Sequence, residues 1–163
     1  MAISPPRGTP VELFMLVQMK VRGLLFDPRG NMYIVVLEDE TRTLPIWVGI
    51  PEANAIALEL EKVLTPRPMT HDLMRNILES LSVSVQKIVV ADLRDNTYFA
   101  TITLNRNGES VDVDSRPSDA IALALRTAAP IYVDEVVLKM QSIESLDEWL
   151  KNVKPEDFGK FNA

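Results

Sequence analysis

The stretch Val111-Asp-Val-Asp-Ser-Arg-Pro-Ser-Asp-Ala-Ile-Ala-Leu-Ala-Leu125 decides the predicted fold, because it runs from a strand directly into a helix. Its first residues alternate between apolar and acidic side chains, which predicts a strand with one buried face. Pro117 suits the first turn of a helix, since the amide that proline lacks would have no partner there. Beyond it, apolar residues recur at the spacing of a helix that packs against an apolar layer.

Polar side chains are dense where this strand passes into the helix: Asp112, Asp114, Arg116, Ser118 and Asp119. A turn would accept almost any polar residues here, so the density of charge favours a functional site. An Asp at a helix start has a second interpretation, since it caps free amides and complements the helix dipole. For Asp119 alone the sequence leaves both interpretations open.

The composition is that of a folded domain. With 163 residues and 47% hydrophobic content, the chain is expected to form one domain with a substantial core. It has no cysteine, which excludes disulfides, thiolate catalysis and zinc–cysteine sites. No apolar run approaches the roughly 20 residues of a membrane span, and no signal peptide is visible at the N-terminus. We therefore expect a cytoplasmic protein without a membrane partner.

The net charge of −6 argues against a constitutive binder of duplex DNA, whose affinity depends on neutralising phosphates with Lys and Arg. An enzyme that meets nucleic acid at one local site, through a bound cation, remains compatible with this charge. Clustered carboxylates are the ligands that such a cation requires.

Periodicity and turn residues predict the order of the elements. Strands are expected at residues 11–26, 31–38, 43–49, 83–93, 97–104, 111–114 and 130–133. Helices are expected at 51–63, 71–81, from 117 onward, 134–140 and 145–153. Thr70 is the expected N-cap of the second helix, and Pro45 indicates an edge strand or a bulge. We expect a flexible arm at 1–10, one domain at 11–140, and a C-terminal helix and tail at 141–163.

A near-repeat links two of the expected helices. Residues 55–60 and 120–125 match in five of six positions, and each segment follows an expected hairpin and a proline-started helix. Small and large apolar residues also alternate in any helix packed closely on a sheet, but the matching context favours a duplicated β-β-α unit. The pattern predicts an α+β fold with packed helices on a mixed, mainly antiparallel sheet.

A second polar segment, Arg67-Pro-Met-Thr-His-Asp72, contains His71, the only histidine of the chain. A lone histidine is often a surface or capping residue. Here it lies at a helix start beside Asp72 and after two prolines, which hold the side chain in place, and histidine transfers protons near neutral pH. Neither a Gly-x-Ser-x-Gly nucleophile motif nor a glycine-rich phosphate loop occurs in the chain.

Several motifs together resemble the bifunctional nuclease family: Leu44-Pro-Ile-Trp-Val-Gly49 with Glu52-Ala53, Arg67-Pro-x-Thr-His-Asp72, and Asp114-x-Arg-Pro-Ser-Asp-Ala-Ile-Ala-Leu123. The resemblance covers about residues 19–140, and the end of the chain is similar to bacterial single-domain members. It implies an α+β fold, self-association as a homodimer or higher homo-oligomer, and cleavage of both DNA and RNA. It implies no catalytic mechanism that can be carried over residue by residue.

Physical chemistry supplies a mechanism for these motif positions. Carboxylates prefer hard cations, so Asp72, Asp114 and Asp119 are predicted to hold Mg²⁺ or Mn²⁺, which would activate water and offset charge in the transition state. His71, with Asp72 beside it, is the predicted catalytic acid or base.

The cationic side chains of the same motifs suit phosphate binding. Arg67 and Arg116 are predicted to clamp the phosphate, because a guanidinium is planar and permanently charged. Glu52 lies at the start of the first repeat helix, where completing a cap is its plain role.

Two other classes of function remain open. In a non-enzymatic oligomeric scaffold or ligand-binding regulatory protein, Asp114, Arg116 and Asp119 would form an internal network of salt bridges and caps. A small-molecule hydrolase that tolerates nucleic acid is the third possibility. Geometry distinguishes them: a catalytic site needs convergent, solvent-reachable carboxylates, whereas a scaffold satisfies each carboxylate with backbone amides or arginines.

Overall fold

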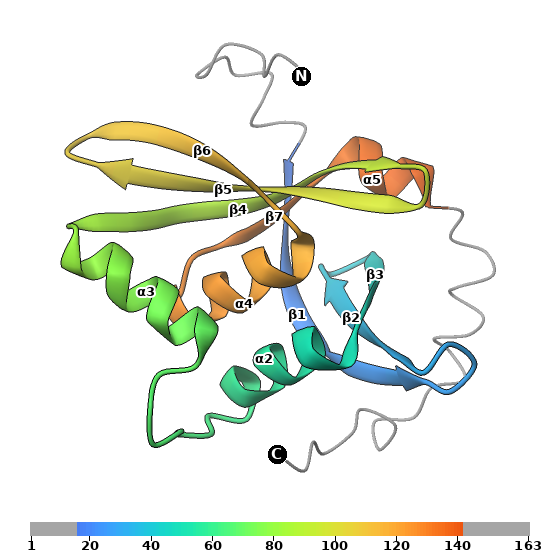
Figure 1. Ribbon diagram of the computed structural model, residues 1–163. Helices are drawn as coiled ribbons and strands as arrows, with labels where there is room; N and C mark the ends of the chain where they lie inside the picture. Colours follow the sequence, from blue (N-terminus) through green and yellow to red (C-terminus); the bar gives the residue numbers. More distant parts are fainter. Residues whose placement is uncertain (1–15, 142–163) are drawn as a thin grey trace.

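Seven strands form one mixed sheet in the computed structural model, which describes residues 16–141 (Figure 1). The spatial order is β3-β2-β1-β7-β4-β5-β6. The strands are β1 (Leu16–Asp27), β2 (Met32–Glu38), β3 (Thr43–Val48), β4 (Val83–Arg94), β5 (Thr97–Arg106), β6 (Glu109–Ser115) and β7 (Ile131–Asp134). The predicted arm at 1–10 and the predicted helix and tail after residue 141 lie outside the described residues.

The pairing confirms the predicted α+β class. β4 and β7 pair in parallel, and every other neighbouring pair in this sheet is antiparallel. Tight turns join antiparallel strands that are consecutive in the chain, because Asn and Gly tolerate the positive φ that such turns need. Asn96 (φ 59°) joins β4 to β5, and Asn107 (φ 52°) with Gly108 (φ 83°) joins β5 to β6.

β3, which contains Pro45, is an edge strand, as the sequence predicts. Pro45 lies opposite Val36 of β2, and β3 forms one edge of the sheet. A proline nitrogen carries no hydrogen and cannot donate to a ladder, so an edge strand tolerates it.

Four helices accompany the sheet in the described residues: α2 (Ile50–Leu60), α3 (Thr70–Ser80), α4 (Pro117–Thr127) and α5 (Glu135–Met140). Figure 1 shows α2, α3 and α4 together on one side of β4–β6, whereas α5 packs against β4 and β7. α4 is the central helix, since it contacts α2, α3, β4 and β5. No helix within residues 16–141 is long and apolar enough to cross a membrane.

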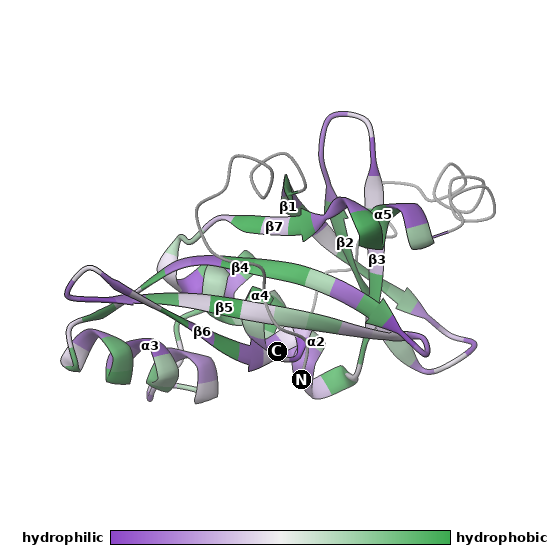
Figure 2. Ribbon diagram, turned by 90° about the horizontal axis from the view of Figure 1, so that it is seen from above, coloured by the Kyte–Doolittle hydropathy of each residue, from purple (hydrophilic) through white to green (hydrophobic). Residues whose placement is uncertain are grey.

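Small residues let α4 approach its neighbours closely. Ala120, Ala122 and Ala124 are at most 1% exposed, and Ala53 and Ala57 of α2 are buried as well. Figure 2 shows hydrophobic residues along the middle of β4 and β5 and hydrophilic residues toward the ends of these strands. The core therefore lies between the middle of the sheet and the helix pair α2 and α4.

The two near-repeat segments form α2 and α4, which pack against each other. α2 contacts β2 and β1, and α4 contacts β4 and β5. These contacts do not establish a duplicated β-β-α unit, which stays a prediction from the sequence.

The predicted N-cap of the second helix is wrong by one residue. Met69, not Thr70, is the N-cap of α3, and Thr70 is the first helical residue. The cause is Asp72, whose Oδ2 accepts a hydrogen bond from the Met69 N–H at 3.0 Å. A carboxylate in the first turn thus satisfies the amide at the N-cap position, so a hydroxyl cap at that position is not needed.

Self-association stays a prediction, and the sheet edges indicate where it would occur. β6 is the edge strand opposite β3, and its Val111 and Val113 are 49% and 41% exposed. Open edges and exposed apolar residues are commonly covered by a second copy. We expect light scattering to give the mass of a homodimer or higher homo-oligomer, and Val113→Lys to lower it. A monomer at micromolar concentration would contradict this prediction.

Candidate functional site

The first turns of α3 and α4 meet through one hydrogen bond. His71 Nε2 lies 2.9 Å from Asp119 Oδ1, although the two residues are 48 positions apart in the sequence. The fold therefore brings together the two polar segments that the sequence analysis singled out. His71 is buried, with 10% of its side chain exposed, and the Asp119 side chain is 28% exposed.

Asp119 also connects this pair to α2. Its Oδ2 accepts a hydrogen bond from Arg116 Nε at 2.9 Å, and Arg116 Nη1 donates to Glu52 Oε1 at 3.1 Å. The four residues Glu52, Arg116, Asp119 and His71 form what we call the helix-start cluster, because each lies at the start of α2, α3 or α4. Helix starts carry a partial positive charge, which favours anions nearby.

The local sequence explains why Asp119 is available for this cluster. Pro117 begins α4, and Arg116 at the N-cap position has an extended backbone without a side-chain cap. The hydrogen bonds to the Asp119 carboxylate come from the side chains of Arg116 and His71. Of the two interpretations of Asp119, the geometry thus favours a polar cluster over a simple cap.

Glu52 takes part in a way that its sequence position does not reveal. Its carboxylate bends back toward Gly49, where an added Cβ would lie 2.4 Å from Glu52 Oε2. The absence of a side chain at Gly49 leaves room for Glu52 to reach Arg116. The motif that joins Gly49 to Glu52 is the only sequence signal for this arrangement.

The electrostatics of the cluster keep it charged. Burial alone would raise the pKa of Asp119, but the hydrogen bonds and charges of Arg116 and His71 outweigh burial, so the pKa of Asp119 is lowered. The hydrogen bond to Asp119, with a further one to Glu52, raises the pKa of Arg116. At neutral pH the cluster holds an ionised carboxylate bound to a guanidinium whose side chain is 63% exposed.

His71 retains one nitrogen for other chemistry. Its Nε2 is engaged by Asp119. In residues 16–141 every fully buried side-chain nitrogen or oxygen has a hydrogen-bond partner. His71 Nδ1 has no hydrogen-bond partner among these residues. Nδ1 is therefore not fully enclosed by protein atoms, although the His71 side chain is only 10% exposed.

Asp72 has a different environment. Its Oδ1 accepts a hydrogen bond from Arg126 Nε at 2.7 Å, and its Oδ2 accepts the bond from Met69. Burial opposes its ionisation, but these bonds outweigh burial and lower the pKa of Asp72. Both oxygens are thus satisfied by a backbone amide and an arginine, the pattern expected of a structural carboxylate.

Arg126 is the residue that the sequence analysis missed. Its side chain is 2% exposed, and besides Asp72 of α3 it binds Ala55 O of α2 at 2.8 Å and Ala122 O of α4 at 2.9 Å. A basic residue that interrupts a run of alanines and leucines on a buried helix is the only sequence signal of this role.

The predicted metal ligands do not converge. Asp114 lies opposite Thr101 on β5, and the preceding Val113 lies opposite Ile102, which belongs to the core under the helices. Because successive strand residues point to opposite faces, Asp114 points to the face away from the helices. Residues 16–141 contain no group of three or more His, Asp or Glu side chains that could hold a metal. Asp72, Asp114 and Asp119 therefore do not fit Mg²⁺ or Mn²⁺ as a common set.

Arg67, the other predicted phosphate ligand, lies outside the helix-start cluster. It is exposed in the loop before α3, where its backbone oxygen accepts a hydrogen bond from Thr65 Oγ1 at 2.8 Å. Of the two predicted phosphate-binding arginines, Arg116 is the one that the fold brings to His71 and Asp119.

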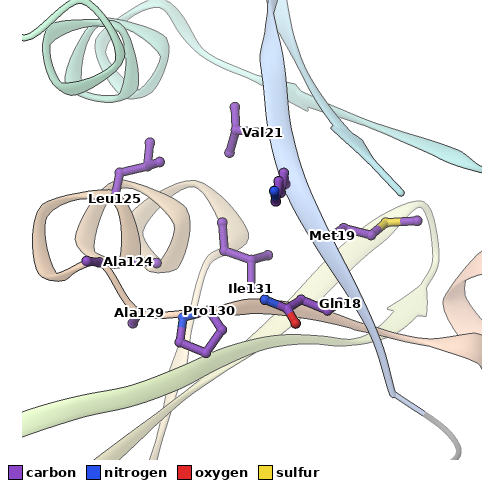
Figure 3. Close-up of a pocket in the computed structure, with 10 residues that line it drawn as sticks. Gln18, Met19, Val21, Ala124, Leu125, Ala129, Pro130 and Ile131 are labelled. Carbon is purple, nitrogen blue, oxygen red and sulfur yellow. The ribbon is translucent and has the colours of Figure 1, made fainter. Parts of the chain in front are cut away.

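A pocket of about 400 Å³ lies elsewhere, between β1 and the C-terminal end of α4 (Figure 3). Leu125 and Ile131 line it together with Val21, and Gln18 and Lys20 supply its polar side chains. The helix-start cluster lies at the opposite end of α4, so this pocket does not contain the candidate site.

Comparison with known proteins fits this geometry. A model of the bifunctional nuclease domain matches residues 34–145, which include the whole helix-start cluster. The chain belongs to the bifunctional nuclease domain family. Uncharacterized proteins from two strains of Mycobacterium tuberculosis are 35% identical over an alignment of 162 positions, which covers 86% of this chain and 97% of theirs.

Plant relatives carry the family name. Bifunctional nuclease 1 of Oryza sativa subsp. indica is 27% identical over 72% of this chain, and bifunctional nuclease 2 of Arabidopsis thaliana is 26% identical over 70%. The aligned parts are 38% and 36% of those longer proteins.

Arg126 generates a stability prediction. Arg126→Met should lower the free energy of unfolding by about 3–5 kcal/mol, because it leaves Asp72 partly buried without its cation and two carbonyls without a donor. Urea denaturation measures the change. Arg75→Met on α3 is the control: Arg75 hydrogen-bonds the neighbouring Asn76 and acts on Asp72 only through its charge, so this change should cost much less. A loss below about 1 kcal/mol for Arg126→Met would contradict the structural role.

Acid should test the role of Asp72. Its pKa in the folded protein is below the ordinary value of 3.8, so its stabilising effect is present above that value and is lost as pH falls through the folded pKa. Between about pH 5 and pH 3 the wild type should lose more unfolding free energy than Asp72→Asn, which has no charge to lose. Parallel stability curves for the two proteins would refute this.

Proposed function

We propose that this protein is a nuclease that cleaves phosphodiester bonds of nucleic acid, with both DNA and RNA as candidate substrates. The observation that carries the proposal is the His71–Asp119 pair beside the exposed guanidinium of Arg116. Family membership and the names of the plant relatives support the same class of reaction.

Arg116 is the proposed phosphate ligand. A guanidinium has five N–H donors in a fixed fork. Within the described residues Arg116 uses one donor for Asp119 and one for Glu52, which leaves three for the oxygens of a phosphate. The two carboxylates hold the fork in place, so little side-chain freedom is lost on binding.

His71 is the proposed catalytic acid or base. Asp119 fixes the imidazole through Nε2 and would stabilise the imidazolium that forms when His71 accepts a proton. Nδ1, the ring nitrogen that Asp119 does not engage, is then the atom that would exchange a proton with the reacting group. Asp72, next to His71, is assigned to the structure of α3 instead of to the chemistry.

No step of this mechanism is routed through a metal, because the predicted carboxylates do not fit one. Arg116 lies between Glu52 and Asp119, the place that a divalent cation bound to both carboxylates would need. We assign the neutralisation of phosphate charge to this guanidinium.

Cleavage and folding measured on one preparation test the proposal. Asp119→Ala should reduce cleavage of DNA or RNA by roughly 10²–10⁴-fold, the usual contribution of positioned acid–base catalysis. Glu79→Ala, an exposed carboxylate in the last turn of α3, is the control and should retain full activity. Assays with and without EDTA, together with Asp114→Ala, test the metal prediction. Loss of cleavage both in EDTA and in Asp114→Ala would support the predicted metal site instead.

The rival function is a non-enzymatic scaffold, which the fully satisfied Asp72 favours. In that case Asp119→Ala lowers the melting temperature and changes no activity. A destabilised but fully active Asp119→Ala protein would refute the catalytic role, and purified wild type without cleavage would refute the nuclease.

A further inference from the structure

An exposed aromatic residue of β3 takes no part in the helix-start cluster. Trp47 lies within the motif Leu44–Gly49 and is 40% exposed. Its neighbours Ile46 and Val48 belong to the core. Because successive strand residues point to opposite faces, Trp47 points to the other face of the sheet. The motif thus places an indole at the surface, where packing in the core does not account for it.

A hydrogen bond fixes this indole in place. Trp47 Nε1 donates to Asp27 Oδ2 at 3.1 Å, and the Asp27 side chain is only 9% exposed. Trp47 lies opposite Ile34 on β2, whereas Asp27 lies on β1, at the far side of β2. Since the bond spans β2, the indole extends along the sheet, with one ring face against it and the other toward solvent. A ring held in this way loses little conformational freedom when a ligand stacks on it.

An exposed guanidinium shares the same carboxylate. Asp27 Oδ1 accepts hydrogen bonds from the backbone N–H and from Nε of Arg29, both at 3.1 Å. The bonds from Trp47 and Arg29 lower the pKa of Asp27, so the carboxylate is ionised at neutral pH. The Arg29 side chain is 76% exposed, and in residues 16–141 no hydrogen bond uses its two terminal nitrogens. One buried carboxylate therefore positions both a stacking surface and a donor for phosphate.

The indole lies near the helix-start cluster. β3 leads through Gly49 into α2 (Figure 1), and the Gly49 backbone is extended, with φ −70° and ψ 168°. Residues two apart on an extended chain share one face and are about 7 Å apart. The carboxylate of Glu52 lies against the Cβ position of Gly49, on this face, and binds Arg116 Nη1 at 3.1 Å. A short single strand can therefore span the distance between Trp47 and Arg116.

We propose that Trp47 and Arg29 form a substrate-binding subsite beside the helix-start cluster: an unpaired base stacks on the indole, and a neighbouring phosphate binds the guanidinium. This inference rests on the proposed nuclease function and names the form of nucleic acid that the site engages. Every base has a π face, so stacking on an aromatic ring accepts any base and either sugar. The subsite suits an enzyme whose candidate substrates are both DNA and RNA.

A second copy of the chain is the other candidate occupant of this surface. β3 is an edge strand, but Pro45 offers no N–H to a pairing strand. The one polar atom of the Trp47 side chain is already bound within its own chain. The exposed cations on either side of the subsite, Arg29 and Arg116, favour a partner that carries phosphates.

Tryptophan fluorescence tests the subsite directly. The chain has two tryptophans, and Trp149→Phe, outside the described residues, leaves Trp47 as the only one. A short oligothymidylate should quench the Trp47 emission of this variant. The same oligonucleotide paired with its complement should quench it much less, because paired bases are already stacked on one another. No quenching, or equal quenching by single strand and duplex, would overturn the inference.

Substitutions separate stacking from simple packing. Trp47→Leu should weaken binding of a labelled oligothymidylate, measured by fluorescence anisotropy, by about 5–150-fold, the affinity equivalent of stacking one base. Trp47→Phe keeps a ring and should lose less. Phe26→Ala is the control, since Phe26 is 46% exposed but packs on Tyr33. Full affinity of Trp47→Leu would overturn the inference, and if melting curves show that this variant does not fold, the quenching experiment decides.

Cleavage assays keep the two proposals apart. With single-stranded substrates Trp47→Leu should raise KM more than it lowers kcat, because the subsite binds the substrate away from the reacting bond. Cleavage by the wild type without quenching of Trp47 would overturn the subsite and leave the nuclease function standing. Quenching without cleavage of any nucleic acid would overturn the nuclease function and leave the subsite. A Trp47 emission that changes with protein concentration, and not with oligonucleotide, would identify a second copy as the occupant and overturn the inference.

Discussion

The buried guanidinium of Arg126 is the interaction on which the helical layer depends. It binds a carboxylate on α3, a carbonyl on α2 and a carbonyl on its own helix, with only 2% of its side chain exposed. A buried charge is tolerated only when its donors are satisfied, so the three helices must keep one relative position or leave a charge unpaired. A hydrophobic residue at this position could fill the same space, but it would impose no such directional constraint on α2 and α3.

The candidate site lies next to the contacts of Arg126. Asp72 receives Arg126, and His71, the residue before it, reaches Asp119. Fixing the first turn of α3 through Asp72 therefore also fixes where the imidazole lies, while Gly49 and Glu52 fix the guanidinium of Arg116 from α2. Two adjacent residues thus have different partners: Asp72 binds Arg126 and Met69, and His71 binds Asp119 of the helix-start cluster. The position of the helix-start cluster therefore depends on the buried contacts of Arg126.

The negative net charge of the chain limits how the protein can attract nucleic acid. The chain carries a net charge of −6, so the phosphates of nucleic acid find no broad attraction, and affinity must come from local groups. In the proposed function the helix-start cluster provides such a group, the exposed Arg116, at the starts of three helices. The carboxylates of β6 belong to another surface, where Asp112 accepts a hydrogen bond from Thr103 on the neighbouring strand. Carboxylates that are close in the sequence are thus divided between two faces of the sheet.

The sequence by itself determined what depends on near neighbours along the chain. Alternation predicts the strands, Asn107 and Gly108 predict a hairpin through their positive φ, and Pro117 predicts the start of α4, because each signal acts over a few residues. It also predicted a candidate site in the segments around His71 and Asp119, and these two segments do meet in the fold. Only the tertiary structure decided which of their side chains meet. The pleat of β6 directs Asp114 to the sheet face away from these helices. The packing of the three helices places Glu52 beside Arg116 and brings Asp72 within hydrogen-bond distance of Arg126. Those partners are 54 and 64 positions apart in the sequence, so no local pattern records them. Their contact is a property of how α2, α3 and α4 pack, which only the burial of all three helices together can set.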